Sequence, residues 1–494
     1  MTSNDALLRD AQAAIERSRA HLDPDYPRFH LAPPVGRLND PNGLIVVDGV
    51  YHAFYQFGPF FPDRKLIYWG HASSTDLTSW QTHPPAVAPG DWFDRSGVYS
   101  GGAVREGGTV WLHYTGNVKD ADGHRESYQC AVTTTDMEHF VKHPANPLIP
   151  GPPPGYTPHV RDPQVIRDGD GYLMLLGAQR ADESGCILVY RGANLESWEL
   201  AGELTFPGLE GRLSGFGYMW ECPNLLRVPD EKTGEIHDVL IFCPQGVGPL
   251  GDGFANIFPC GYLIGELVGT AFHAAGEFVE LDRGFEFYAP QVFSGSADGL
   301  QAGPVLMGWL GNASEDDQPS LREHGWVHMM SVPRRLSLRD GVLIQRPDLD
   351  LGPVHGCESE GAMITEDPVV IDEVTGVESY WLTLDVARPA EGEWTMTLGG
   401  GNDSRVVITF GPEALTVDRG ATRYPHGERR TLAVELPDRV RIDLVHDRSV
   451  TEMFIDDGRL AFSMRTYLSQ GTRRLAITSE QGGEIVAARV RVAK

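Results

Sequence analysis

Asp40 lies in the stretch of this chain whose residue types are best suited to chemistry, Asn39-Asp40-Pro41-Asn42-Gly43. The carboxylate sits between two amides and a proline, and the apolar residues 44–47 follow at once. Asn, Asp, Pro and Gly all favour tight turns, so the stretch alone is equally well explained by a turn with a solvated carboxylate. The catalytic interpretation depends on what recurs later in the chain.

Two further carboxylates, Asp162 and Glu221, occupy related places in an internal repeat. Each unit has a polar residue, a short apolar strand, a turn rich in Asp and Gly, and a second apolar strand. The units begin at Asp40, Ser100, Asp162, Glu221 and Gln291. A period of about 60 to 70 residues is typical of propeller blades and predicts a five-bladed β-propeller over residues 29–346. A row of separate small sandwiches explains the units less well, because no linkers divide them.

The propeller geometry would bring these side chains together, because the first strand of each blade lines the central channel. Four positions are then equivalent and should face one another: Asp40, Ser100, Asp162 and Glu221. Carboxylates placed close together push their pKa values apart, and such pairs perform glycoside hydrolysis. Taken singly, Asp162 is better explained as a strand-end ion pair, and Glu221 as a buried glutamate bonded to backbone. Because Asp162 and Glu221 occupy the same place in the repeat as Asp40, a catalytic role is favoured over a structural one for both.

The two ends of the chain differ from the repeat. Residues 5–22, within an N-terminal segment of residues 1–28, carry apolar side chains at helical spacing. Residues 347–362 are rich in Pro, Gly and acidic residues and are predicted to be a linker. Short alternating strands over residues 363–494 predict a β-sandwich. The predicted fold class is all-β: a five-bladed β-propeller followed by a C-terminal β-sandwich, with a short N-terminal helix.

The composition narrows the classes of partner. The chain has 494 residues and a formal net charge of −27, which disfavours nucleic acid and anionic membranes. No export signal or apolar run of membrane-spanning length is visible, so a cytoplasmic protein is expected. The six cysteines lack CxxC spacing and are predicted to be reduced, with Cys222 a buried thiol rather than a nucleophile. The histidines show no metal-binding spacing, and neither a metal nor a cofactor is expected.

Three motifs together resemble those of a known enzyme family. They are the stretch around Asp40, Arg161-Asp162-Pro163 and Glu221-Cys222-Pro223. Related stretches of the family fall at residues 68–72, 99–101, 288–291 and 447–454. Each motif alone is weak, but all of them occur in order and in register over residues 29–494. The chain therefore resembles the invertases, or β-fructofuranosidases, of glycoside hydrolase family 32, which pair a five-bladed propeller with a C-terminal sandwich.

The resemblance implies a role for each motif. Asp40 would be the nucleophile at the fructosyl anomeric carbon, and Glu221 the general acid/base. Asp162 would hydrogen-bond ring hydroxyls, and Arg161 is expected to keep this carboxyl ionised through a charge-assisted bond. The fructosyl subsite would be lined by Asn39, Gln56, Trp69, Ser100 and Arg161. A retaining glycosidase needs one ionised and one protonated carboxyl, about 5–5.5 Å apart, and no cofactor.

The expected activity is release of terminal β-D-fructosyl residues from sucrose, sucrose 6-phosphate or short fructo-oligosaccharides with net retention. Fructan exo-hydrolysis and fructosyl transfer on the same scaffold remain alternatives. An alternative from a different class is a non-catalytic sugar-binding propeller, which predicts loss of at least one carboxylate. The expected partner is a small sugar, without nucleic acid or membrane. A homo-oligomer, and the purpose of the N-terminal helix, stay open.

Overall fold

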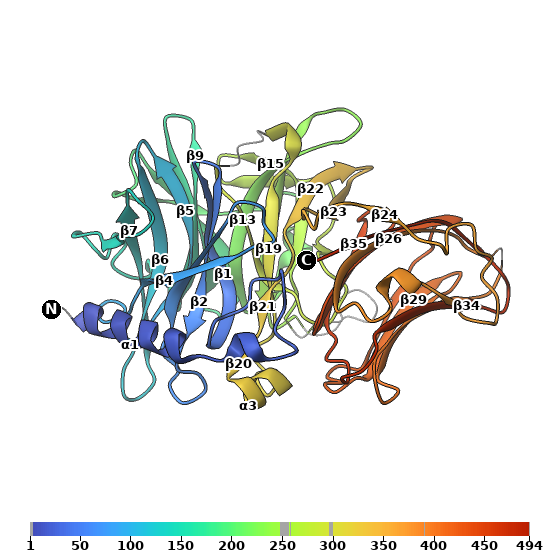
Figure 1. The fold of residues 1–494 in the computed structure, drawn as a ribbon. Coiled ribbons are helices and arrows are strands. Elements are labelled where there is room, and N and C mark those ends of the chain that lie inside the picture. Colours follow the sequence, from blue (N-terminus) through green and yellow to red (C-terminus); the bar gives the residue numbers. More distant parts are fainter. Residues whose placement is uncertain (1–2, 248–255, 257, 296–299, 390, 494) are drawn as a thin grey trace.

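The computed structural model describes residues 3–247, 256, 258–295, 300–389 and 391–493. Strands far outnumber helices, and Figure 1 shows a larger N-terminal part beside a smaller two-layered C-terminal part. The helical segments are α1 (Ser3–Arg17), η1 (Ala20–Leu22), α2 (Glu210–Leu213), η2 (Leu300–Ala302), α3 (Pro319–His324) and η3 (Asp372–Val374). Within the described ranges, no helix has the length and apolar character needed to cross a bilayer. The all-β prediction with a short N-terminal helix is confirmed.

Helix α1 packs against the first sheet of the larger part. Its Ala11 is fully buried, and Leu7, Leu8 and Ile15 pack against the core below. The helix ends at Arg17, earlier than the predicted residue 22, because the chain turns into η1 and leaves the Leu22 side chain 62% exposed. The helix is therefore part of the larger domain's wall.

Residues 36–347 form five antiparallel sheets in sequence order. Their strands, sheet by sheet, are β1 (Gly36–Val47), β2 (Val50–Gly58), β3 (Tyr68–Ser74) and β4 (Gln81–Val87); β5 (Gly97–Glu106), β6 (Thr109–Lys119), β7 (Arg125–Thr134) and β8 (Val141–Lys142); β9 (Tyr156–Asp168), β10 (Gly171–Arg180), β11 (Gly185–Gly192) and β12 (Glu199–Glu203); β13 (Met219–Pro229), β14 (Ile236–Gln245), β15 (Gly261–Val268), β16 (Ala271–Ala274) and β17 (Val279–Glu280); and β18 (Tyr288–Val292), β19 (Val305–Leu310), β21 (Met329–Met330), β22 (Arg334–Arg339) and β23 (Val342–Pro347). Strand β20 (Trp326–Val327) returns to pair in parallel with β1.

The first strands of the five sheets, β1, β5, β9, β13 and β18, contact one another in a closed ring, with β18 next to β1. These are called the ring strands below. The turns that follow β1, β9 and β13 contain the predicted Asp and Gly residues. Asp48 and Gly49, for example, both have positive φ (51° and 83°) where β1 turns into β2, as a tight hairpin requires. Residues 296–299 of the fifth predicted unit lie outside the described residues.

Each ring strand carries an extra residue relative to its hairpin partner near the cavity, which makes a β-bulge, and β1 and β9 each have a second irregularity. The bulges fall at residues 39–40, 100, 162–163, 222–223 and 289–290. Asp162, Cys222 and Ala289 share a positive φ (64°, 48° and 47°), and each precedes a proline. Aligned on these prolines, Cys222 rather than Glu221 is the equivalent of Asp162. The predicted equivalence was therefore off by one residue in the fourth unit.

The C-terminal part consists of two six-stranded sheets. One contains β24 (His355–Gly356), β26 (Ser379–Ala387), β31 (Arg439–Asp447), β32 (Val450–Ile455), β33 (Leu460–Arg465) and β35 (Glu484–Val492); the other contains β25 (Val369–Val370), β27 (Trp394–Gly399), β28 (Arg405–Phe410), β29 (Ala414–Ala421), β30 (Arg429–Ala433) and β34 (Arg474–Ser479). Burial alternates along β27, where Trp394, Met396 and Leu398 enter the shared core. This alternation is what a sheet with one covered face requires.

A buried chain of charges joins the two parts. His30, just before β1, binds Asp447 Oδ2 through Nδ1 (2.9 Å) and Glu452 Oε1 through Nε2 (3.1 Å), and all three side chains are fully buried. Arg334 of β22 binds Glu452 (2.5 Å) and Asp282 (2.9 Å). Burial lowers the pKa of His30, but its bonds to Asp447 and Glu452 outweigh this effect and raise the pKa to about 9. The junction therefore depends on a histidine that stays charged at neutral pH.

Replacing His30 is expected to destabilise the protein in a pH-dependent way. His30→Gln leaves the buried Asp447 without its cation and Glu452 with Arg334 alone, and breaking a buried ion pair costs about 3–5 kcal/mol near pH 7. Because the folded-state pKa lies near 9, the contribution of His30 is fully present below about pH 6.5 and is lost as the pH rises through 9. In thermal melts from pH 6 to 10, the difference in melting temperature between wild type and variant should become smaller as the pH rises.

The matched control is His139→Gln. His139 also bonds a carboxylate, that of Asp136, but its side chain is 81% exposed. Ion pairs this exposed contribute little to stability because water screens them, so this variant should melt close to wild type. Equal effects of the two substitutions would contradict the importance of the buried junction.

Candidate active site

A cavity of about 770 Å³ opens at one end of the ring strands. Six of the eight residues predicted to form the site line it: Asn39, Asp40, Gln56, Arg161, Asp162 and Glu221. The three carboxylates come from β1, β9 and β13, which are far apart in sequence. In the ring, β9 and β13 are neighbours, and β1 faces them across β5 on one side and β18 on the other. The ring thus brings together side chains that the repeat spacing had singled out.

The Asp40 carboxylate is held by uncharged donors. Its Oδ2 accepts hydrogen bonds from Ser100 Oγ (2.5 Å) and Gln56 Nε2 (2.9 Å), and its Oδ1 accepts one from Asn39 Nδ2 (3.3 Å). Burial raises the pKa of Asp40, the Ser100 bond lowers it, and the charge of Glu221 raises it. The hydrogen bonds that orient this carboxylate all come from neutral donors, which suits an attacking group.

Glu221 is held differently, by a cation and a phenol. Arg161 donates from Nε and Nη2 to Glu221 Oε1 (2.8 and 2.6 Å), and Tyr288 donates its hydroxyl to Oε2 (2.7 Å). The Arg161 guanidinium lies 3.9 Å from Asp162. Its hydrogen bonds therefore go to Glu221 rather than to Asp162, contrary to the expected pairing. The register explains the difference, because Arg161 and Glu221 occupy equivalent places on neighbouring ring strands.

Asp162 occupies a more enclosed place. Its Oδ2 accepts a hydrogen bond from the Cys222 backbone N–H (3.1 Å), and the Cys222 thiol lies 3.6 Å away. Burial raises the pKa of Asp162 to about 7, with Arg161 lowering it and the charge of Glu221 raising it. Burial also raises the pKa of the Cys222 thiol, which is buried as predicted. The thiol is therefore a neutral neighbour of this carboxyl.

Ser100 and Trp69 lie behind the cavity lining. Both are fully buried, and neither lines the cavity. Ser100 acts on Asp40 directly through its hydrogen bond. Trp69 donates its Nε1–H to the Tyr99 carbonyl (3.0 Å), and Tyr99 lines the cavity. Their contacts are therefore with the residues that form the cavity wall.

Sequence reasoning gave no role to Tyr288, although its hydroxyl bonds Glu221. A signal was present in the chain: Arg161, Glu221 and Tyr288 each stand two residues before a proline. Aligning the units on the prolines would have placed these three side chains at equivalent positions. His159, which bonds Arg161 Nη1 (2.9 Å), was likewise not singled out.

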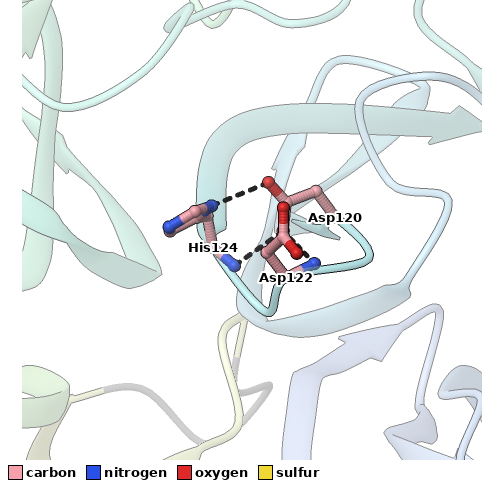
Figure 2. Close-up of side chains that lie close together, drawn as sticks. All are labelled: Asp120, Asp122 and His124. Atoms are coloured by element: carbon pink, nitrogen blue, oxygen red, sulfur yellow. Dashed lines mark hydrogen bonds and ion pairs between the residues drawn. The ribbon is translucent and has the colours of Figure 1, made fainter.

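One group of metal-ligand type occurs within the described part of the chain, at the turn between β6 and β7 (Figure 2). It consists of Asp120, Asp122 and His124. Asp120 Oδ1 already accepts the backbone N–H groups of Asp122 (2.9 Å) and His124 (2.8 Å), and its Oδ2 bonds His124 Nδ1 (2.9 Å). These contacts are those of a self-contained turn, and all three residues are exposed.

Comparison with known proteins decides the family. Residues 30–347 match the model of the glycosyl hydrolases family 32 N-terminal domain, and residues 361–493 match that of the family's C-terminal domain. The chain belongs to glycosyl hydrolase family 32. As a member of this family it is a glycosidase, in agreement with the resemblance found in the sequence.

Three family members illustrate the similarity. A sucrose-6-phosphate hydrolase of Bacillus subtilis is 33% identical, with 98% of each chain covered. The solved sucrose-6-phosphate hydrolase of Lactobacillus gasseri is 30% identical, covers 99% of this chain and 96% of its own, and superposes with a TM-score of 0.83. A β-fructofuranosidase of Bombyx mori, solved as a D63A mutant in complex with sucrose, is 26% identical, with a TM-score of 0.83 and coverage of 100% and 99%.

Neutralising Asp162 is expected to stabilise this glycosidase toward alkaline pH. The folded-state pKa near 7 lies above the ordinary value of 3.8, so the protonated carboxyl contributes stability below about pH 4 that is lost as the pH rises through 7. Asp162→Asn cannot ionise and lacks this loss. The melting temperature of the variant minus that of wild type should therefore increase from pH 5 to 8. A difference that stays constant over this range would contradict the assigned pKa.

Proposed function

We propose that this family 32 member releases terminal β-D-fructosyl residues from sucrose, sucrose 6-phosphate or short fructo-oligosaccharides, with retention of configuration. The observation that carries the proposal is that two carboxylates in one cavity have hydrogen-bond partners of different kinds. Asp40 is held by neutral donors, and Glu221 by Arg161 and Tyr288. The names of the relatives, sucrose-6-phosphate hydrolase and β-fructofuranosidase, support the same substrate class.

The proposed reaction has two steps. In the first, a carboxylate oxygen of Asp40 attacks the fructosyl anomeric carbon while Glu221 gives its proton to the departing glycosidic oxygen, so that an ester replaces the glycosidic bond. In the second, Glu221 takes a proton from water, and the resulting hydroxyl attacks the same carbon and releases Asp40. Two inversions at one carbon give net retention.

The remaining residues bind and position the sugar in this proposal. Asp162 accepts hydrogen bonds from ring hydroxyls, and these strengthen as charge develops on the ring. Asn39 and Gln56 contact both Asp40 and the cavity, so they fix the nucleophile and the fructosyl unit together. Ser100 and Trp69 act from behind the lining, as positioning residues.

We assign the architecture as a five-bladed propeller over residues 29–346, preceded by the helical lead-in of residues 1–28. Five successive sheets and the closed ring of first strands support this assignment. Residues 347–362 would form the linker, and residues 363–494 the C-terminal sandwich, whose two sheets share one core. All six cysteines are free and buried, which supports a reducing compartment such as the cytoplasm.

Three alternatives are distinguished by their substrates and products. A fructosyltransferase would pass the fructosyl group to a sugar instead of water, and a fructan exo-hydrolase would prefer inulin to sucrose. A sugar-binding propeller would release no fructose from any of these substrates.

Substituting either catalytic carboxylate is expected to abolish turnover. Asp40→Asn and Glu221→Gln should each lower kcat/KM for sucrose by at least about 10³-fold, because each removes a group that acts in the transition state. Asp136→Asn, at an exposed turn of the same domain, is the control and should keep wild-type activity. Wild-type rates in either carboxylate variant would contradict the roles. Absence of fructose release by wild type would overturn the function itself.

A further inference from the structure

Six arginine and lysine side chains border the cavity that holds the three carboxylates. Arg37 and Arg161 form ion pairs with Asp316 and Glu221, which leaves four others. Arg64 and Lys65 come from the connection between β2 and β3, and Lys119 and Arg125 from the facing ends of β6 and β7. Among the residues that the structure describes, no carboxylate forms a hydrogen bond or ion pair with any of the four side chains. Four basic side chains without a carboxylate partner at one cavity are unexpected in a chain with a net charge of −27.

Lys119 and Arg125 form an unfavourable pair unless something binds them. They stand directly opposite each other as the last pair of the β6–β7 hairpin, and like charges directly opposite across two strands are destabilising. The turn between them is fixed by Asp120, whose carboxylate bonds the His124 ring and the backbone of the turn (Figure 2). The hairpin thus holds two cations together at the mouth of the cavity.

Contacts place this pair on the Glu221 side of the cavity. The Arg125 guanidinium lies 5.6 Å from the centre of the Tyr99 ring. His159 has its pKa lowered to about 4 by burial, by Arg161 and by Arg125, so Arg125 lies near this ring. His159 in turn bonds Arg161, which bonds Glu221. A leaving group that takes its proton from Glu221 therefore departs toward Lys119 and Arg125.

We propose that Lys119 and Arg125 are specificity-determining residues that bind a phosphate monoester on the leaving-group sugar. This inference rests on the proposed function and selects sucrose phosphorylated on its glucosyl unit from the substrates named there. Arg125 supplies two donors in a planar fork that matches phosphate oxygens, and Lys119 supplies a mobile point charge. The dianion relieves the repulsion between the two cations.

Arg64 and Lys65 provide a matched comparison within the same cavity. Each lies near an aromatic ring of its own loop, Arg64 over Phe60 (5.8 Å) and Lys65 over Phe61 (5.8 Å). They are exposed and carry the same combined charge as the proposed site. Removing them changes the electrostatic field at the cavity without touching the hairpin pair.

The test compares kcat/KM for sucrose 6-phosphate with kcat/KM for sucrose at low ionic strength. Wild type should prefer the phosphorylated sugar by at least tenfold. In Lys119→Ala/Arg125→Ala this ratio should fall by about 10- to 100-fold, as expected for lost charge-assisted bonds. In Arg64→Ala/Lys65→Ala it should change less than about threefold. If the hairpin double variant does not fold, Lys119→Met, which keeps the aliphatic stem, replaces it with a smaller fall expected.

Inhibition by products gives a second readout. Glucose 6-phosphate should inhibit wild type more strongly than glucose, and the difference should disappear in the hairpin variant. Equal losses in the two double variants would overturn the assignment, because they would indicate a general field effect. Wild-type turnover of sucrose without preference for the phosphorylated sugar would overturn it while leaving the proposed function intact. Turnover of neither sugar would overturn both.

Discussion

The β-bulge that each ring strand carries near the cavity is the constraint on which the site depends. A regular strand sends successive side chains to opposite faces, so two adjacent residues cannot both serve one cavity. The bulge at Asp162 changes this, because its positive φ turns the chain locally. Arg161 and Asp162 can then both line the cavity although they are neighbours in sequence. Four of the five bulges contain or directly precede a proline, which carries no N–H group that the disturbed ladder would leave unpaired.

Arg161 determines how charge is distributed among the carboxylates. Its guanidinium makes two short bonds to Glu221 and lies further from Asp162, while Asp40 has only neutral donors. The pKa values of Asp40 and Asp162 are both raised, first by burial and then by the charges nearby. Close packing of like charges is costly to stability, and active sites commonly accept this cost. One arginine therefore makes a cluster of three acids compatible with a folded protein.

The sequence predicted what depends on periodicity and missed what depends on register. Short strands, Asp/Gly turns and the spacing of Asp40, Asp162 and Glu221 were visible because each is a local pattern. The partner of Arg161 was predicted wrongly, since a one-residue shift in the fourth unit decides whether Glu221 or Cys222 matches Asp162. Lys119 and Arg125 also escaped notice. They are unremarkable in sequence and become a pair only through the hairpin register.

The basic residues at the mouth of the cavity matter for an anionic substrate because the rest of the protein is strongly acidic. A chain with a net charge of −27 repels a phosphorylated sugar at long range. Screening limits that repulsion to about 8–10 Å at physiological salt, so nearby cations decide the potential that a substrate meets at the entrance. Four basic side chains at one cavity offset, at close range, the negative charge of the rest of the chain. Selectivity for an anionic substrate thus requires no change in overall charge, only cations held at the mouth by a rigid hairpin.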